Sequence, residues 1–173
     1  AIPLPKASRA GWLIEKAVEL GVTNIIPLKT SRSVVDPRSS KLDTLRQNIV
    51  AASKQCGRSR LMTISPVVAW ADFLKNECKG KSVVVAHPGG ASFTGTLISE
   101  SLTEIAAEAK TKKAKANPEM IAAIGPEGGF TVEEITQAVS KGGRLVSLGP
   151  RLLRVETAGA MMASVFVSAQ LVD

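Results

Sequence analysis

Two loops near the carboxyl end of the chain have residue types and a spacing that suit ligand binding. The first, Gly125–Phe130, holds three glycines, a proline and a glutamate and follows an apolar segment, Glu119–Ile124. The second, Leu148–Arg154, follows the apolar segment Leu145–Ser147. In an open α/β sheet, ligands bind beyond the carboxyl ends of the strands, where loops lead into helices. Glycines there permit sharp turns and close approach of the backbone, although one such turn alone is more often structural.

Common nucleotide-binding and hydrolytic motifs do not fit these loops. Gly125–Phe130 lacks the GxGxxG spacing, and Gly90–Gly95 has the glycines of a P-loop but continues with Thr96-Leu97 in place of Lys-Ser/Thr. No serine stands in a nucleophile elbow, and His87 has no evident triad partner. Because these motifs are absent, the sequence favours other functions over those of ATPases, dinucleotide-dependent dehydrogenases and α/β-hydrolases.

The charge balance favours a polyanionic partner. Lys and Arg outnumber Asp and Glu by 22 to 15, which gives a net charge of +7, and each phosphate that a cation neutralises releases condensed counterions. On charge alone, a basic protein without such a partner remains an equal alternative. With no Tyr, 4 Phe and 2 Trp, an aromatic platform for single strands is not expected. Contacts to RNA would come from arginine, lysine and backbone groups.

Few residues are available for metal binding. Cys56 and Cys78 form no CxxC pair, and His87 is the single histidine, so we expect no metal and two reduced, structural thiols. No apolar run approaches the length of a membrane helix, so no membrane contact is expected. The chain begins at Ala1 without a secretory signal pattern. We expect a cytoplasmic protein, or one inside a plastid or mitochondrion if a transit peptide has been removed.

Apolar and polar segments alternate along the whole chain, which predicts an α/β fold with a parallel sheet flanked by helices. Thr131, with Glu134 three residues later, forms a capping box that begins a helix. The stretch His87–Thr94 is predicted as a glycine-bearing loop and Lys110–Asn117 as an exposed connector. The other predicted helices are Ser8–Leu20, Ser39–Cys56, Ala69–Cys78, Gly95–Ala109 and Glu156–Leu171, and the predicted strands are Asn24–Leu28, Met62–Val68, Ser82–Ala86, Glu119–Ile124 and Leu145–Ser147.

Four segments carry a family resemblance. Ile124–Thr131 resembles one signature of the ribosomal RNA uridine N3-methyltransferases, and Ser147–Ala158 resembles the next signature at the spacing that the family uses. Lys16–Val22 looks like the KATELGV segment of the family, and Gln55–Arg58 looks like its QSGR segment. The matches run in the same order from about Lys6 to the C-terminus.

The family belongs to the trefoil-knotted methyltransferases, known as the SPOUT type. The resemblance implies one domain over residues 1–173, with a parallel sheet whose C-terminal segment threads a loop to form a trefoil knot. It also implies S-adenosylmethionine as cofactor, a homodimer, and a uridine of small-subunit ribosomal RNA as target. Two departures from the family are noted: the sequence starts just before the KATELGV-like segment, so we expect the usual N-terminal RNA-binding barrel to be absent, and Val155 stands where threonine is frequent.

The resemblance also suggests which residues bind the cofactor. Apolar side chains and backbone groups of the two C-terminal loops would form the pocket, with His87 and Pro88 at its first loop. Glu127 is expected to orient its loop rather than touch the methyl donor, and His87 has a local hydrogen bond as its alternative role. The full predicted set is His87, Pro88, Ile124, Gly125, Glu127, Gly128, Leu148, Gly149 and Leu153.

In methylation at uridine N3, a neighbouring cation would stabilise the anion formed at N3 and its carbonyls. Arg58, Arg151 and Arg154 are the candidates, with phosphate binding or a brace to Glu156 as the alternative for each. Glu156 is a candidate base or a salt-bridge partner, and Thr157 would bond substrate or cap the last helix. Residues expected to contact RNA phosphates are Arg32, Arg38 and Arg60.

Two other functions remain open from the sequence. One is a related knotted enzyme that methylates a ribose 2′-hydroxyl or another base, because the Gly-Pro-Glu-Gly motif is shared widely. The stretch Leu148–Arg154 favours the uridine enzymes over that alternative. The other is a non-catalytic RNA-binding or ribosome-assembly module that kept the fold.

Overall fold

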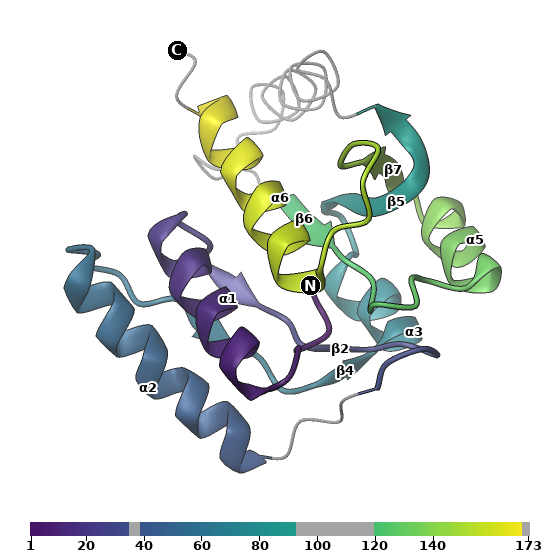
Figure 1. The fold of residues 1–173 in the computed structure, drawn as a ribbon. Helices are drawn as coiled ribbons and strands as arrows, with labels where there is room; N and C mark the ends of the chain where they lie inside the picture. Colours follow the sequence, from purple (N-terminus) through teal and green to yellow (C-terminus); the bar gives the residue numbers. More distant parts are fainter. Residues whose placement is uncertain (35–38, 93–119, 171–173) are drawn as a thin grey trace.

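A parallel β-sheet is the framework of this protein, as the computed structural model shows for residues 1–34, 39–92 and 120–170 (Figure 1). The strands β1 and β2 pair in parallel with β3 and β4, and the central strand β5 pairs in parallel with β6 and β7. The described strands are β1 (Asn24–Ile25), β2 (Leu28–Lys29), β3 (Thr63–Ile64), β4 (Val68–Ala69), β5 (Ser82–Ser92), β6 (Met120–Ala123) and β7 (Arg144–Ser147).

The first residues of the chain link these strand groups by backbone hydrogen bonds. The amide of Ile2 donates to the carbonyl of Ile26 over 2.9 Å, and the amide of Ile124 donates to the carbonyl of Ala1 over 2.9 Å. Ala1 and Ile2 therefore lie between the β1–β2 stretch and β6. These hydrogen bonds connect the β1–β2 stretch to β6, so they fix the relative position of the loops that follow β2 and β6.

Helices cover both faces of the sheet (Figure 1). Val84 of β5 belongs to the apolar core under one set of helices, while its neighbours Val83 and Val85 belong to the core under the other set. This alternation follows from the two-residue period of a strand. The first face carries α1 (Ala7–Glu19), α2 (Ser39–Gln55) and α6 (Val155–Gln170), and the second carries α3 (Trp70–Asp72), the π-helical turn η1 (Phe73–Glu77) and α5 (Val132–Ser140).

The helix α6 packs closely along α1. A Cβ atom on Gly159 would lie 3.0 Å from a methyl group of Leu13 and 3.0 Å from one of Ile2. A larger residue at this position would push α6 away from the sheet. The small residue therefore allows the N-terminal half of α6 to lie close to that of α1.

The structure confirms the predicted parallel sheet with flanking helices and the capping box at Thr131. One loop prediction is wrong in part: β5 continues through the expected loop to Ser92, because the chain pairs with β7 again after a register shift beyond Ala86. The predicted helix Gly95–Ala109 and connector Lys110–Asn117 lie outside the described residues. The trefoil knot stays a prediction.

Candidate active site

Loops that follow parallel strands meet at one edge of the sheet, because the strands all end there. Residues 30–33 follow β2, and residues 124–130 follow β6. Residues 148–154 follow β7, and residues 87–90 follow the first part of β5. The cofactor residues predicted from the sequence therefore share this edge: His87, Pro88, Ile124, Gly125, Glu127, Gly128, Leu148, Gly149 and Leu153.

The loop at residues 87–90 is held against the end of β7. Ala86 and Ala91 both pair with Val146, so the residues between them leave the ladder and return to it. At Gly90 a Cβ atom would lie 2.5 Å from the Val146 nitrogen, so only glycine permits this approach. The His87 Nδ1 atom accepts a hydrogen bond from the amide of Gly89 over 3.0 Å. His87 thus makes the local contact that the sequence offered as its alternative role.

The Gly125–Phe130 loop is a tight turn on the end of β6. Gly129 has a φ of +68°, and its amide donates to the carbonyl of Pro126 over 2.8 Å. A Cβ atom on Gly125 would lie 3.1 Å from the ring of Phe130, which packs against Trp70 with its ring centroid 4.5 Å away. The turn is therefore rigid on its inner side.

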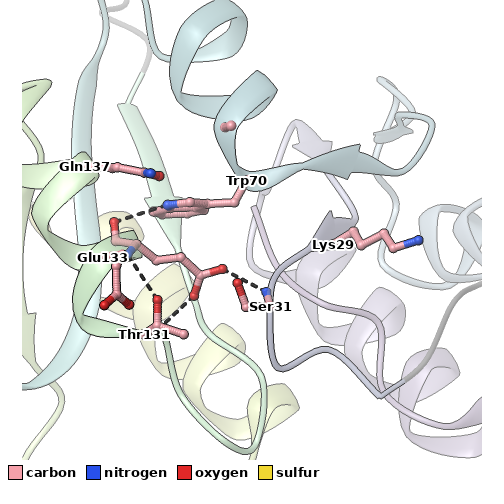
Figure 2. Close-up of a pocket in the computed structure, with 8 residues that line it drawn as sticks. Lys29, Ser31, Trp70, Thr131, Glu133 and Gln137 are labelled. Carbon is pink, nitrogen blue, oxygen red and sulfur yellow. Dashed lines mark hydrogen bonds between the residues drawn. The ribbon is translucent and has the colours of Figure 1, made fainter.

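A buried carboxylate clamps this loop to the segment after β2. The Glu134 Oε2 atom accepts the amide of Thr131, and Oε1 accepts the amide of Ser31, each over 2.8 Å (Figure 2). The Trp70 Nε1–H donates to the Glu134 carbonyl over 3.1 Å. Both carboxylate oxygens are thus satisfied, as a buried charge requires. The neighbouring Glu133 is exposed, and its own backbone N–H is the main cause that holds the pKa of its carboxyl below the ordinary value.

Beside this clamp lies an open pocket of about 410 Å³ (Figure 2). Among the described residues, none of those predicted to bind the cofactor lines it. The pocket is therefore distinct from the loops that the sequence singled out. Its lining residues are Lys29, Ser31, Trp70, Ala71, Thr131, Glu133, Glu134 and Gln137.

In the loop after β7, two apolar side chains face the core and two charged side chains face solvent. Leu148 and Leu153 are half-buried and pack against the α1–α2–α6 core, whereas Leu152 is 93% exposed. Arg151 and Arg154 are exposed. The loop thus offers an apolar inner wall and two cations at its rim.

Glu156 lies in the first turn of α6 with its side chain only 8% exposed. Its Oε1 atom is 3.6 Å from Nη1 of Arg9, and the same Nη1 is 3.8 Å from Oε1 of Glu127. The Glu156 Oε2 atom is buried and has no hydrogen-bond partner among the described residues. The positive end of the α6 dipole favours a carboxylate here. Thr157 follows in the same turn and is exposed.

Arg9 is a residue that the sequence interpretation missed. It lies in the first turn of an amphipathic helix, where an arginine is usually a solvated surface residue. Only the fold places that turn beside the Gly125–Phe130 loop and α6. The signal available in the sequence was weak: a basic residue among apolar ones, seven positions before the Lys16–Val22 match.

Arg58 lies at the other edge of the sheet. Its Nη1 donates to the carbonyl of Val18 over 3.0 Å and its Nη2 to that of Gly21 over 3.3 Å, at the C-terminal end of α1. The helix α1 has 13 residues, so about 20 Å separates this end from the end near Arg9. Within one chain the structure does not bring Arg58 to the predicted cofactor loops, and its catalytic role stays a prediction.

The three predicted RNA contacts have different positions. Arg32 lies at the cofactor edge, where its Nη1 donates to the carbonyl of Gly128 over 2.7 Å. Arg60 is exposed in the turn before β3, at the same edge as Arg58. Arg38 lies outside the described residues.

Two general properties of the described residues bear on function. No group of three or more His, Cys, Asp and Glu residues lies close enough together there to hold a metal ion. Within the same ranges, no helix combines the length and the apolar character needed to cross a bilayer.

Known proteins resemble this chain over nearly its whole length. The sequence profile of a family described as an RNA methyltransferase domain matches residues 1–167. A Synechocystis protein named ribosomal RNA small subunit methyltransferase E is 32% identical over 158 residues, which cover 91% of this chain and 48% of that protein. This chain therefore spans about half the length of that relative.

Solved structures have the same fold. A protein from Legionella pneumophila, described as a methyltransferase with S-adenosylmethionine bound, is 29% identical with a TM-score of 0.76; the match covers 98% of this chain and 64% of that one. Ribosomal RNA small subunit methyltransferase E from Neisseria gonorrhoeae, bound to S-adenosylmethionine, is 23% identical with a TM-score of 0.75; the match covers 96% and 63%. Because the Neisseria protein is only 23% identical to this chain, its likeness shows the fold alone. The family profile covers most of the residues that build the sheet and its loops, so the chain belongs to the RNA methyltransferase domain family.

Proposed function

We propose that this chain binds S-adenosylmethionine at the carboxyl edge of its sheet and methylates N3 of a uridine in small-subunit ribosomal RNA. One observation carries the proposal: the loops at residues 87–90, 124–130 and 148–154 follow strands of one parallel sheet and lie at a common edge. The cofactor found in the Legionella relative and the name of the Synechocystis relative support the choice of methyl donor and RNA.

The residues present fit S-adenosylmethionine. The half-buried Leu148 and Leu153 supply apolar surface for the adenine ring, and the glycine-rich turns bring backbone donors and acceptors close to it. When bound, the cofactor supplies an activated methyl group on a sulfonium centre. The protein must then align the acceptor and exclude water.

Arg151 and Arg154 are the cations best placed for the acceptor base. Both are exposed on the loop that would bound the cofactor. Uridine N3 is engaged in base pairing, so the base must be unpaired or turned out of its helix to reach the site. An arginine beside it stabilises the charge that forms on N3 and its carbonyls as the proton leaves. Arg32, at the same edge, is a phosphate contact in this proposal.

The apolar character of α6 supports a homodimer. Glu156 is the one charged residue in this helix, and Met161 on its outer side is 38% exposed. An outer helix face that is apolar is expected to be covered by a partner. Sedimentation equilibrium should show that the wild-type protein is a dimer and that Met161→Glu is a monomer. A wild-type monomer at about 50 μM would contradict the proposed dimer, because obligate interfaces have dissociation constants far below this concentration.

Nucleoside mass spectrometry tests the reaction. Small ribosomal subunits that lack the modification are incubated with the chain and S-adenosylmethionine, digested, and analysed for N3-methyluridine. We expect N3-methyluridine in proportion to added enzyme. Ribose methylation would support the related-enzyme alternative, and no methylation together with no cofactor binding would support an RNA-binding module. Because the Synechocystis relative is about twice as long as this chain, the same assay with that protein serves as the positive control.

A further inference from the structure

We propose that Arg9 is a positioning residue of the cofactor site, which holds the tip of the Gly125–Phe130 loop against the first turn of α6. Its link to the methyl donor rests on the function proposed above; the bracing itself does not. Nothing in the loop motifs points to Arg9, because it comes from α1, more than 110 positions earlier in the chain. The geometry of Arg9, Glu127 and Glu156 carries the inference.

The guanidinium of Arg9 connects two segments of the site. Its Nη1 atom lies 3.6 Å from Oε1 of Glu156 and 3.8 Å from Oε1 of Glu127. The close approach of Leu13 to Gly159 places the N-terminal halves of α1 and α6 side by side. The cation therefore reaches both carboxylates without a change in the backbone.

The two ion pairs differ in strength because their burial differs. Glu156 is almost fully buried, and Arg9 is its one ion-pair partner within 4 Å among the described residues. Loss of one partner of a buried pair is costly, because it leaves a charge without compensation. The side chain of Glu127 is 52% exposed, so its pair with Arg9 alone would contribute little. Glu156 thus fixes the guanidinium, and the fixed guanidinium then orients Glu127.

The loop tip is held from two sides. Arg9 attracts the side chain of Glu127, and Arg32 donates to the carbonyl of the next residue, Gly128, over 2.7 Å. A loop held at adjacent residues by cations from two different segments has few conformations left to lose on binding. The two arginines therefore pre-organise the turn that is proposed to contact the cofactor.

Two measurements on purified protein test this role. The variants are Arg9→Gln, Arg9→Lys and Glu127→Gln, and the control is Arg46→Gln, which removes an exposed arginine paired with Asp43 on α2. Amide hydrogen exchange of residues 125–130 in the unliganded protein reports the bracing. Calorimetry with S-adenosylmethionine reports its consequence for affinity.

We expect Arg9→Gln to speed exchange in the loop by about tenfold and to weaken cofactor binding by about tenfold, equivalent to about 1.4 kcal/mol. Arg9→Lys should fall between Arg9→Gln and wild type, because it keeps the positive charge but lacks the planar guanidinium group. Glu127→Gln leaves the buried pair intact and should reproduce part of the loop exchange without loss of global stability. Arg46→Gln should match wild type in both measurements.

Unchanged loop exchange in folded Arg9→Gln and Glu127→Gln would overturn the bracing. Faster loop exchange with unchanged cofactor affinity would overturn the positioning role. If the wild-type protein binds no S-adenosylmethionine, the proposed function fails, and the hydrogen exchange still decides the bracing by itself. If Arg9→Gln does not fold, Glu127→Gln and Arg9→Lys decide both points.

Discussion

Gly90 of β5 and Val146 of β7 touch backbone to backbone. A Cβ atom on Gly90 would lie 2.5 Å from the Val146 nitrogen and 2.6 Å from its carbonyl carbon. Because residues 87–90 precede this contact and residues 148–154 follow it closely, one glycine sets the relative position of two loops of the candidate site. This contact was not predicted from the sequence, because the glycines in that stretch indicated an ordinary loop.

Substitution of Gly90 by alanine should open this contact. Neither partner is a flexible side-chain end, so the two strands must shift, which costs about 1–3 kcal/mol of unfolding free energy. Cofactor affinity should fall with it. Urea unfolding and calorimetry measure the two effects. Gly89→Ala is the matched control, because its Cβ would meet only the His87 ring, at 3.3 Å; equal behaviour of the two variants would contradict the account.

Leucines 152 and 153 form a second matched pair. Leu153 packs against the core, while Leu152 is 93% exposed. Leu153→Arg should abolish cofactor binding, because it places a charge on the apolar wall of the proposed pocket. Leu152→Arg should bind about as wild type does. Calorimetry with S-adenosylmethionine distinguishes them, and full binding by Leu153→Arg would remove this loop from the pocket.

Arg154 is predicted to act on the acceptor base. Arg154→Ala should leave the affinity for S-adenosylmethionine nearly unchanged and lower turnover by about 100-fold, the effect of losing one group that stabilises charge in the transition state. Methylation of small subunits under saturating cofactor gives the rate. Arg46→Ala is the control for loss of a surface charge. Wild-type turnover in Arg154→Ala would take Arg154 out of the catalytic set.

Glu134 is predicted to stabilise the fold through its two backbone contacts. Glu134→Gln keeps the volume but turns an NH₂ group towards the amide of Ser31 or Thr131, which leaves a buried donor unsatisfied at a cost of about 1–3 kcal/mol. Chemical unfolding measures the loss. Glu133→Gln, at an exposed neighbour, should change stability far less. Equal stability of the two variants would show that the clamp is not needed.

The two cysteines provide a check that each variant is folded. Burial raises the pKa of the Cys78 thiol to about 11, so the reactive thiolate is scarce at pH 8 and becomes abundant only as the pH approaches that value. Iodoacetamide at pH 8 should modify the exposed Cys56 and spare Cys78 until the protein unfolds. Rapid modification of Cys78 in a native sample would contradict the burial.

Regular elements of the described part were predictable from the sequence because local rules determine them. Three consecutive valines predicted the buried centre of β5, and the Thr131–Glu134 box predicted the start of α5. The extension of β5 was not predictable, because it depends on pairing with a strand about 55 residues later.

The position of the candidate loops at one edge of the sheet could be predicted from the sequence, whereas contacts between single residues could not. Family signatures locate loops, and parallel strand order brings these loops to one edge. Which arginine faces which carboxylate depends on tertiary packing: Arg58 has its contacts at the end of α1, whereas Arg9 lies between Glu127 and Glu156. Sequence spacing carries no information on such long-range pairs.

A crystal structure of the chain with S-adenosylmethionine tests the central claim most directly. We predict the cofactor between residues 87–90, 124–130 and 148–153, with its adenine ring against Leu148 and Leu153. Density for the cofactor in the pocket beside Trp70 and Gln137, or at the amino edge near Arg58, would contradict the assignment of these loops.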